Sequence, residues 1–221
     1  MLTFVRTDPT APKHKGISAL LIRTDTPGVL CRPFASVYDR DDLDFNEVFF
    51  NDVQVPAENL VGPLNGGWRV ANGSLGHERT LMWMAFANRL EQLLEDYRPA
   101  DEVNRDHYAT IVMDYYALRL LGSAALGRAA RGDVDVAALS TLKVLGSEAE
   151  QNALRHALDA AGLDGLRDKV LTAPYNPYAP NLFTASWFAR YNSSYAGTIA
   201  GGTSEIQRNI IAQRVLGLPS R

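Results

Sequence analysis

The feature of the sequence that most constrains the fold is a change in hydrophobic period between residues 60 and 68. Before it, short apolar runs alternate with turn-rich pieces, which predicts strands at 17–23, 29–34 and 47–55. After it, apolar residues recur every three or four positions, which predicts helices at 68–97, 104–131, 136–161, 182–195 and 204–215. We therefore expect a mainly α fold, with a partial antiparallel β domain at 1–60 and a four- to five-helix up-down bundle at 61–221.

The helical period also selects the side chains that we expect to face the core. In the first helix these are Leu75, Leu81, Met82, Ala85, Phe86, Leu90 and Leu93. In the second helix they are Ile111, Tyr115, Leu118, Leu121, Ala125 and Leu126, and Gly132 is expected to end that helix. The segment 172–180 is rich in proline, which lacks a backbone N–H, so we predict a loop there.

Composition excludes some classes of function. The chain of 221 residues is long enough to bury a core, and its net charge of −3 argues against binding to nucleic acid or to an anionic membrane. No apolar run approaches the ~20 residues needed to cross a bilayer, and no secretory signal is recognisable, so we expect a cytoplasmic protein. The single cysteine, Cys31, is expected to be a small apolar residue in a strand. The four histidines lack metal-ligand spacing, so no metal site is predicted.

The segment most suggestive of a binding site is Gly201, Gly202, Thr203, Ser204 and Glu205. Two glycines let the backbone approach a ligand closely, and the next two residues stand where a helix N-cap belongs. Ser204 and Gln207 have the spacing of a capping box. The start of such a helix suits an anion or the electron-rich edge of a cofactor, although a capped surface helix after a glycine turn is the commoner meaning of this spacing.

The segment 200–211, AGGTSEIQRNII, resembles the C-terminal signature of the acyl-CoA dehydrogenase family of flavoproteins. Other segments resemble the same family in the same order, at 5–9, 13–18, 25–28, 48–60 and 66–68. The resemblance implies FAD as the cofactor, α,β-dehydrogenation of an acyl-CoA thioester, an electron-transfer partner, and a homo- or hetero-oligomer, either dimer or tetramer. By this comparison the chain begins inside the middle β domain of the family.

The resemblance also implies a catalytic base. Most relatives carry a glutamate immediately before the Gly-Thr-Ser of the signature, but this chain has Gly201 there, which cannot take a proton. A minority, similar to the isovaleryl-CoA and long-chain enzymes, place the base on the first bundle helix, in a Leu-x-x-Glu-Arg pattern that Leu75, Glu78 and Arg79 match. Glu78 is therefore the predicted base, on the apolar face of its helix. Without the resemblance, a solvated surface glutamate would be the ordinary interpretation.

Further roles are implied for residues that match the family's motifs. Thr203, Ser204 and Glu205 match positions beside the flavin, and Glu205 is the weakest match because a carboxylate near a pyrophosphate is unfavourable unless it is paired. Gly202 matches a residue that lies against the substrate. Arg79 matches an arginine that reaches the coenzyme A portion, with a surface ion pair as its alternative role.

Two family motifs that contact the flavin of a neighbouring subunit are altered here. The segment 95–104 lacks the usual Phe-Gly, and the usual Gln-x-x-Gly-Gly segment begins with Asp159. This combination resembles subunits of actinobacterial heteromeric acyl-CoA dehydrogenases that act on sterol side chains, in which unlike chains share the active sites. Two alternatives stay open: a non-catalytic assembly subunit of such an enzyme, and a flavin oxidase or monooxygenase on the same scaffold.

Overall fold

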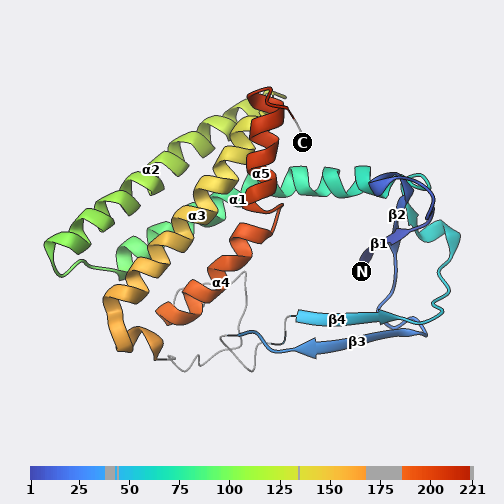
Figure 1. Ribbon diagram of the computed structural model, residues 1–221, viewed down its shortest axis with the longest axis horizontal. Helices are drawn as coiled ribbons and strands as arrows, with labels where there is room; N and C mark the ends of the chain where they lie inside the picture. Colours follow the sequence, from blue (N-terminus) through green and yellow to red (C-terminus); the bar gives the residue numbers. More distant parts are fainter. Residues whose placement is uncertain (38–42, 44, 134, 168–185, 220–221) are drawn as a thin grey trace. The chain divides into compact units, whose positions relative to one another are not determined.

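The computed structural model describes residues 1–37, 43, 45–133, 135–167 and 186–219 of the chain (Figure 1). The predicted proline-rich loop at 172–180 and the first residues of the predicted helix at 182–195 lie outside this description. The chain divides into two compact units, residues 1–77 and 78–221. The division falls inside the first long helix, α1 (Gly67–Asp96), whereas the sequence pattern separates strands from helices at residue 60.

The first unit contains two small antiparallel sheets. One has the strand order β1 (Leu2–Arg6), β2 (Ile17–Leu21) and β5 (Leu60–Val61). The other pairs β3 (Val29–Phe34) with β4 (Phe45–Phe50) in the register Val29 to Phe50 and Phe34 to Phe45. The sequence did not predict β1, and it placed the last long strand at 47–55 instead of 45–50. Cys31 lies in β3 as expected, but its side chain is exposed.

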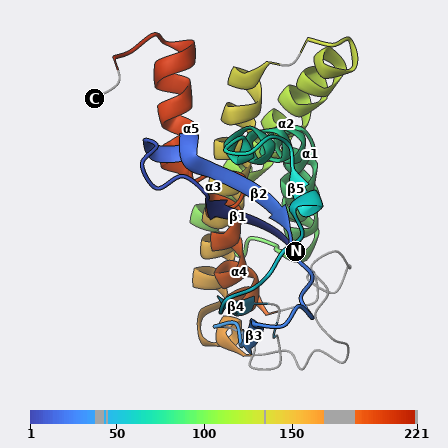
Figure 2. The same ribbon diagram turned by 90° about the vertical axis from the view of Figure 1, so that its right-hand side faces the viewer.

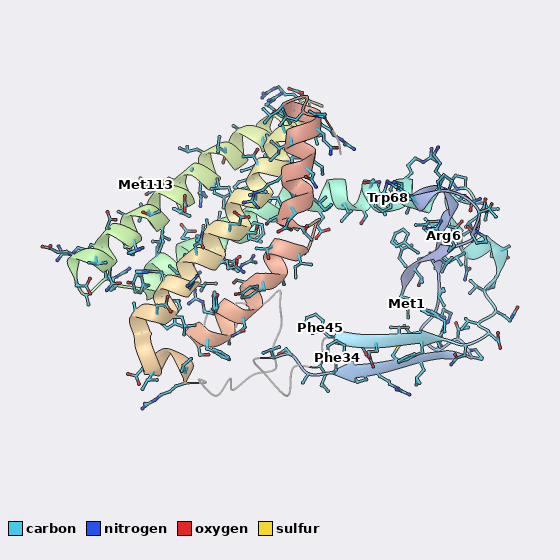
Figure 3. All side chains as sticks on the ribbon, in the orientation of Figure 1. Met1, Arg6, Phe34, Phe45, Trp68 and Met113 are labelled. Atoms are coloured by element: carbon cyan, nitrogen blue, oxygen red, sulfur yellow. The ribbon has the colours of Figure 1, made fainter. Side chains whose placement is uncertain are left out.

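The β3–β4 hairpin is uncovered within the described residues. Most side chains of both strands are exposed, including those of Phe34 and Phe45, whose rings stack with centroids 5.8 Å apart (Figure 3). A two-stranded hairpin with no covered face is only marginally stable by itself in water. A larger β structure or a partner is therefore the expected context of this hairpin.

The second unit is a helical bundle, which confirms the predicted fold class. After α1 come α2 (Glu102–Ala130), α3 (Val136–Ala161), α4 (Trp187–Ile199) and α5 (Ser204–Ile210), and α5 continues into a π-helical turn, Ile211–Val215. Helix α3 packs against α2, α4 and α5, as two views of the bundle show (Figures 1 and 2). The predicted bounds of α3 are confirmed to the residue.

Side-chain caps explain why four of the helices begin where they do. Each of these N-cap side chains accepts a hydrogen bond from a backbone N–H in the first turn of its helix. The caps are Asp101 for α2, Asp135 for α3, Ser186 for α4 and Thr203 for α5. Such a cap stabilises a helix by about 1 kcal/mol relative to alanine. Gly132 follows the end of α2 with φ of +81°, in the left-handed conformation that glycine adopts without strain.

The bundle core contains most, but not all, of the side chains predicted to face it. Leu81 and Ala85 of α1 are exposed, and so are Leu121 and Leu126 of α2. The buried stripe of α1 instead follows Trp83, Phe86, Ala87, Leu90 and Leu93. Two glycines select this stripe, because the ring of Trp83 lies against Gly122 of α2 and that of Phe86 against Gly146 of α3. Helix-helix contact decided which of many neighbouring apolar residues became buried.

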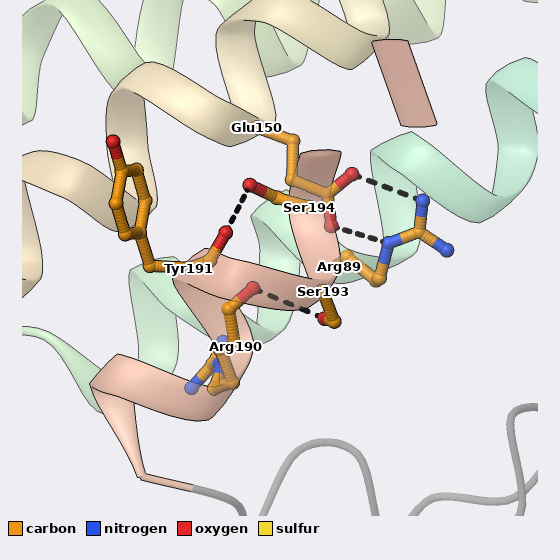
Figure 4. Close-up of polar contacts among 6 residues, drawn as sticks. All are labelled: Arg89, Glu150, Arg190, Tyr191, Ser193 and Ser194. Carbon is orange, nitrogen blue, oxygen red and sulfur yellow. Dashed lines mark hydrogen bonds and ion pairs between the residues drawn. The ribbon is translucent and has the colours of Figure 1, made fainter. Parts of the chain in front are cut away.

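A buried ion pair connects α1 to α3 within the bundle. Arg89 donates two hydrogen bonds to the carboxylate of Glu150, one of them 2.9 Å long (Figure 4). Its guanidinium also lies over the ring of Phe86. The Glu150 side chain is almost fully buried, so loss of Arg89 alone would leave a buried charge without its partner. This pair fixes the position of α3, which contributes one wall of the site described next.

None of the helices in the described residues is both long enough and apolar enough to cross a membrane.

Candidate functional site

A pocket of about 370 Å³ lies at the start of α5. Its lining comes from α3, α4 and the turn between α4 and α5: Glu148, Gln151, Asn152, Tyr195, Thr198, Ile199, Thr203, Ser204 and Glu205. The structure thus brings together two groups of residues. Thr203, Ser204 and Glu205 were selected in the sequence analysis, whereas the polar side chains of α3 were not. This pocket is the candidate functional site.

The turn that forms the pocket depends on two glycines. Gly201 and Gly202 have φ of +67° and +98°, in the left-handed region that other residues enter only with strain. A β-carbon on Gly202 would also lie 2.8 Å from Nε2 of Gln207. That nitrogen donates a 2.9 Å hydrogen bond to the carbonyl oxygen of Gly201. The backbone conformation of the turn between α4 and α5 therefore favours glycine at both positions.

Gln207 has a different role from the one that the sequence suggested. Its spacing from Ser204 predicted a capping box, but the N-cap of α5 is Thr203, whose hydroxyl accepts from the N–H of Ile206 at 3.3 Å. Gln207 is completely buried and holds the glycine turn through its side-chain amide. A glutamine one turn into an amphipathic helix resembles any surface glutamine in sequence, so this role could not be predicted.

Two polar atoms of the pocket lining are buried without a hydrogen-bond partner in the described part of the chain. They are Oγ of Ser204 and Nε2 of Gln151. Buried polar atoms in native proteins almost always have a partner, because desolvation without a hydrogen bond costs about 1–3 kcal/mol. A ligand or ordered water with hydrogen-bonding atoms would satisfy both groups.

Glu205 remains ionised in this pocket. Its pKa is lowered by a hydrogen bond from its own backbone N–H and then by one from the Thr203 hydroxyl, with smaller effects from the positive charges of Arg208 and Lys143. Arg208 also donates to Glu148 across 2.7 Å. The carboxylate therefore has the compensating groups that it needs beside an anionic ligand.

A second pocket, of about 330 Å³, lies where the α1–α2 connection meets the end of α3 and the start of α4. The altered segment 95–104 lines it, together with Ala157, Ala160, Ala161 and Trp187. The hydroxyl of Tyr97 is 3.1 Å from Nε2 of His156, and the His156 ring stacks on that of His107 with centroids 4.2 Å apart. Aromatic rings thus occupy this end of the bundle.

The predicted base is not buried within the described residues. Glu78 is exposed on α1, on the same side as Leu81 and Ala85, which follow at helical spacing and are also exposed. The predicted sharing of an apolar face with Met82 does not bury the carboxylate. The side chain of Arg79 lies outside the description, and Gly202 lies in the turn at the pocket. The catalytic and substrate-binding roles of these residues stay predictions.

Comparison with known proteins identifies the family. The family described as "Acyl-CoA dehydrogenase, C-terminal domain" matches residues 65–216. Over 97% of its length the chain is 33% identical to the acyl-CoA dehydrogenase FadE34 and to the acyl-CoA dehydrogenase IpdE1, both of Mycobacterium tuberculosis. It spans 28% of FadE34 and 54% of IpdE1.

A solved structure, the Tcur3481-Tcur3483 steroid ACAD, is also similar. It superposes with a TM-score of 0.78 and 25% identity over 99% of this chain and 56% of that one. Like the curated relatives, it extends well beyond the part that this chain matches.

Proposed function

The chain belongs to the acyl-CoA dehydrogenase family, and from that premise we propose that it forms part of an FAD-dependent enzyme that oxidises an acyl-CoA thioester between its α and β carbons. The observation that carries the proposal is the pocket at the start of α5, where Thr203, Ser204 and Glu205 lie together. The resemblance to the family signature implies that these residues lie beside the flavin. The relatives are longer than this chain, so the proposed activity is that of an assembled enzyme.

The pocket fits one portion of FAD. Its volume of about 370 Å³ admits a chain of hydroxyl groups such as the ribityl. The Thr203 hydroxyl and the two buried groups without partners, Oγ of Ser204 and Nε2 of Gln151, suit such hydroxyls. Glu148 and Glu205 would repel a phosphate placed directly against them, and Arg208 and Lys143 offset that repulsion.

In the proposed reaction, bound FAD would supply the hydride acceptor for the β carbon of the thioester, and Thr203 and Ser204 would hold its ribityl portion. A carboxylate oxygen of Glu78 takes the proton from the α carbon, a role that an enclosed site without water would favour. The exposure of Leu81 and Ala85 beside Glu78 supports a covering partner on this side of α1. The cover is either a further part of the same protein or a second chain, and it would bury the base at the same time.

We further propose that the substrate carries a sterol-derived acyl group and that unlike chains share the active sites. The likeness to a steroid ACAD and to two mycobacterial acyl-CoA dehydrogenases supports this assignment. So does the second pocket, which is lined by the altered segment 95–104, where Tyr97 stands in place of a motif that in the family contacts a neighbour's flavin. In such an arrangement this chain would contact its own flavin but not the flavin of the neighbouring subunit.

A second candidate function is a non-catalytic assembly subunit. The exposed position of Glu78 favours it, because a general base must lie against bound substrate and the described residues do not enclose this carboxylate. In that case the bundle would support the active site of another chain. The substitution that separates the two functions is Glu78→Gln.

A chimera tests both candidates. In it, this chain replaces the part of IpdE1 that it matches. FAD binding is measured first, and the reduction of the flavin by acyl-CoA thioesters is then followed in the absence of oxygen. We expect a flavin-containing chimera, whereas the chain alone binds FAD weakly. Glu78→Gln should retain FAD and slow flavin reduction by about 10²–10⁴-fold, the usual effect of a lost general base. A Glu78→Gln chimera that reduces flavin at the unsubstituted rate would establish the assembly role instead.

A further inference from the structure

Lys143 is a buried cation that takes no part in the proposed proton and hydride transfers. It lies on α3 with only 1% of its surface exposed. Its ammonium donates a 3.0 Å hydrogen bond to the carbonyl oxygen of Thr198 on α4. Burial lowers the pKa of this ammonium, and the nearby carboxylates of Glu148 and Glu205 partly oppose that effect. An apolar residue of similar size would avoid the desolvation of a charge, so stability does not explain a lysine here.

The partner of Lys143 indicates what it does. Thr198 is in the last turn of α4, which ends at Ile199, and the carbonyl groups of a last turn have no partner within their own helix. A cation at this end of a helix also interacts favourably with the helix dipole. Lys143 therefore anchors the end of α4 to α3 just before the chain enters the glycine turn.

The other end of that turn is held by Gln207. Its Nε2 donates to the carbonyl oxygen of Gly201 from the first turns of α5. Two buried side chains from different helices thus hold the backbone on either side of Ala200. Thr198 itself lines the pocket, and Thr203 and Ser204 follow directly after the turn.

We propose that Lys143 is a positioning residue, which fixes the turn between α4 and α5 and so determines where the side chains of Thr203 and Ser204 stand in the pocket. The identity of the ligand as FAD rests on the proposed function, but the positioning of the turn does not. Lys143 acts through the Thr198 carbonyl and does not touch the ligand.

Hydrogen-deuterium exchange on the 221-residue chain tests the positioning. In Lys143→Met we expect the amides of 200–207 to exchange at least about tenfold faster, which corresponds to a local loss of about 1.4 kcal/mol. The amides of 111–125 in α2 should keep their rates, and the melting temperature should be unchanged or higher because a buried charge is gone. Lys143→Arg, which keeps a cationic donor, should restore most of the protection at 200–207.

Arg208→Met is the matched control, since it removes the other cation near Glu148 and Glu205 but not the bond to Thr198. It should leave exchange at 200–207 unchanged. Equal acceleration in Arg208→Met would show that positive charge, not the hydrogen bond, orders the turn, and would overturn the proposal. Unchanged exchange in Lys143→Met, or acceleration that is uniform along the chain, would overturn it as well.

Two further measurements complete the test. If Lys143→Met does not fold, the unsubstituted chain with labelled lysine should show a slowly exchanging ammonium signal coupled to the Thr198 carbonyl, and its absence would refute the bond. In the IpdE1 chimera, Lys143→Met should weaken FAD binding about tenfold. Faster exchange at 200–207 with unchanged FAD affinity would preserve the positioning role and reject the assignment of this pocket to FAD.

Discussion

The indole ring of Trp83 on α1 lies against the backbone of Gly122 on α2, so closely that a β-carbon on Gly122 would come within 2.3 Å of the ring. Both residues are buried in the bundle, where glycine lets the two helices approach. The Phe86 ring has the same relation to Gly146 of α3, at 2.6 Å. The two contacts determine which side of α1 faces the core, and hence that Glu78, Leu81 and Ala85 face outward.

The first prediction concerns this contact. Gly122→Ala must displace Trp83 or separate the helices, so we expect overpacking to destabilise the chain by about 1–3 kcal/mol and to lower its melting temperature by roughly 3–10 °C. Gly127→Ala on the same helix is the control, because a β-carbon there would find only a side-chain atom of Arg131, at 3.8 Å. That change should be neutral or stabilising, since alanine favours helix by about 1 kcal/mol over glycine. Equal melting temperatures for the two variants would contradict this account of the packing.

The second prediction concerns a base at the family's commoner position. Gly201→Glu would place a carboxylate there, but the residue has φ of +67°. We expect the left-handed backbone to cost about 1–3 kcal/mol with glutamate, so that thermal unfolding occurs at a lower temperature. Gly217→Glu, at φ of +65° with no atom within 4 Å of its β-carbon, measures the cost of the conformation alone. If Gly201→Glu is as stable as the unsubstituted chain, the turn can adopt another conformation and the glycine is not required by the backbone.

Much of the bundle could be predicted from the sequence, because helix starts are encoded locally. The caps of α2, α3 and α5 stand directly before periodic apolar segments, and these three helices were predicted to begin within two residues of their observed starts. Helix α4 begins at Trp187, five residues after its predicted start. Among the pocket residues, Thr203 and Ser204 were selected as N-cap residues, whereas Glu205 was selected by its match to the family signature.

What could not be predicted depends on contacts between distant segments. Residues 81–87 of α1 are almost all apolar, so periodicity alone could not choose Trp83 and Phe86 over Leu81 and Ala85. Lys143 interrupts an apolar pattern as a surface lysine would, and only the position of Thr198, 55 residues away, shows its role. Strand β1 was missed because its exposed and half-buried residues carry little hydrophobic contrast.

The third prediction is a loss of stability in acid that depends on two histidines. Burial lowers the pKa of His156, and the stacked His107 lowers it further. As the pH falls through 6.5, the unfolded chain therefore binds a proton before the folded chain does, and the folded state loses stability until the pH is below the folded pKa. His107→Gln removes the competing charge, so the pKa of His156 should rise and the loss of melting temperature between pH 7 and pH 5 should become smaller.

The His156 ring signal in an NMR titration measures this pKa directly. His14→Gln, in the first unit of the chain, is the control and should leave the titration of His156 unchanged. If His107→Gln leaves the pKa of His156 where it was, the stacked ring does not act through its charge, and the acid sensitivity of this end of the bundle has another origin.

The last prediction is that the chain associates through its β3–β4 hairpin. Both faces of this two-stranded sheet are exposed in the described residues, and Phe34 and Phe45 form a stacked apolar pair on it. Open strand edges and uncovered aromatic rings favour pairing with another chain. Light scattering after size-exclusion chromatography should show dimers or larger species at micromolar concentration, and Phe45→Lys should shift them toward monomer because a charge on the apolar pair opposes its burial. Leu163→Lys, at an exposed leucine of the helical unit, should leave the distribution unchanged. A chain that is strictly monomeric at these concentrations would show that the hairpin alone does not drive association and that its cover must be supplied by a different partner.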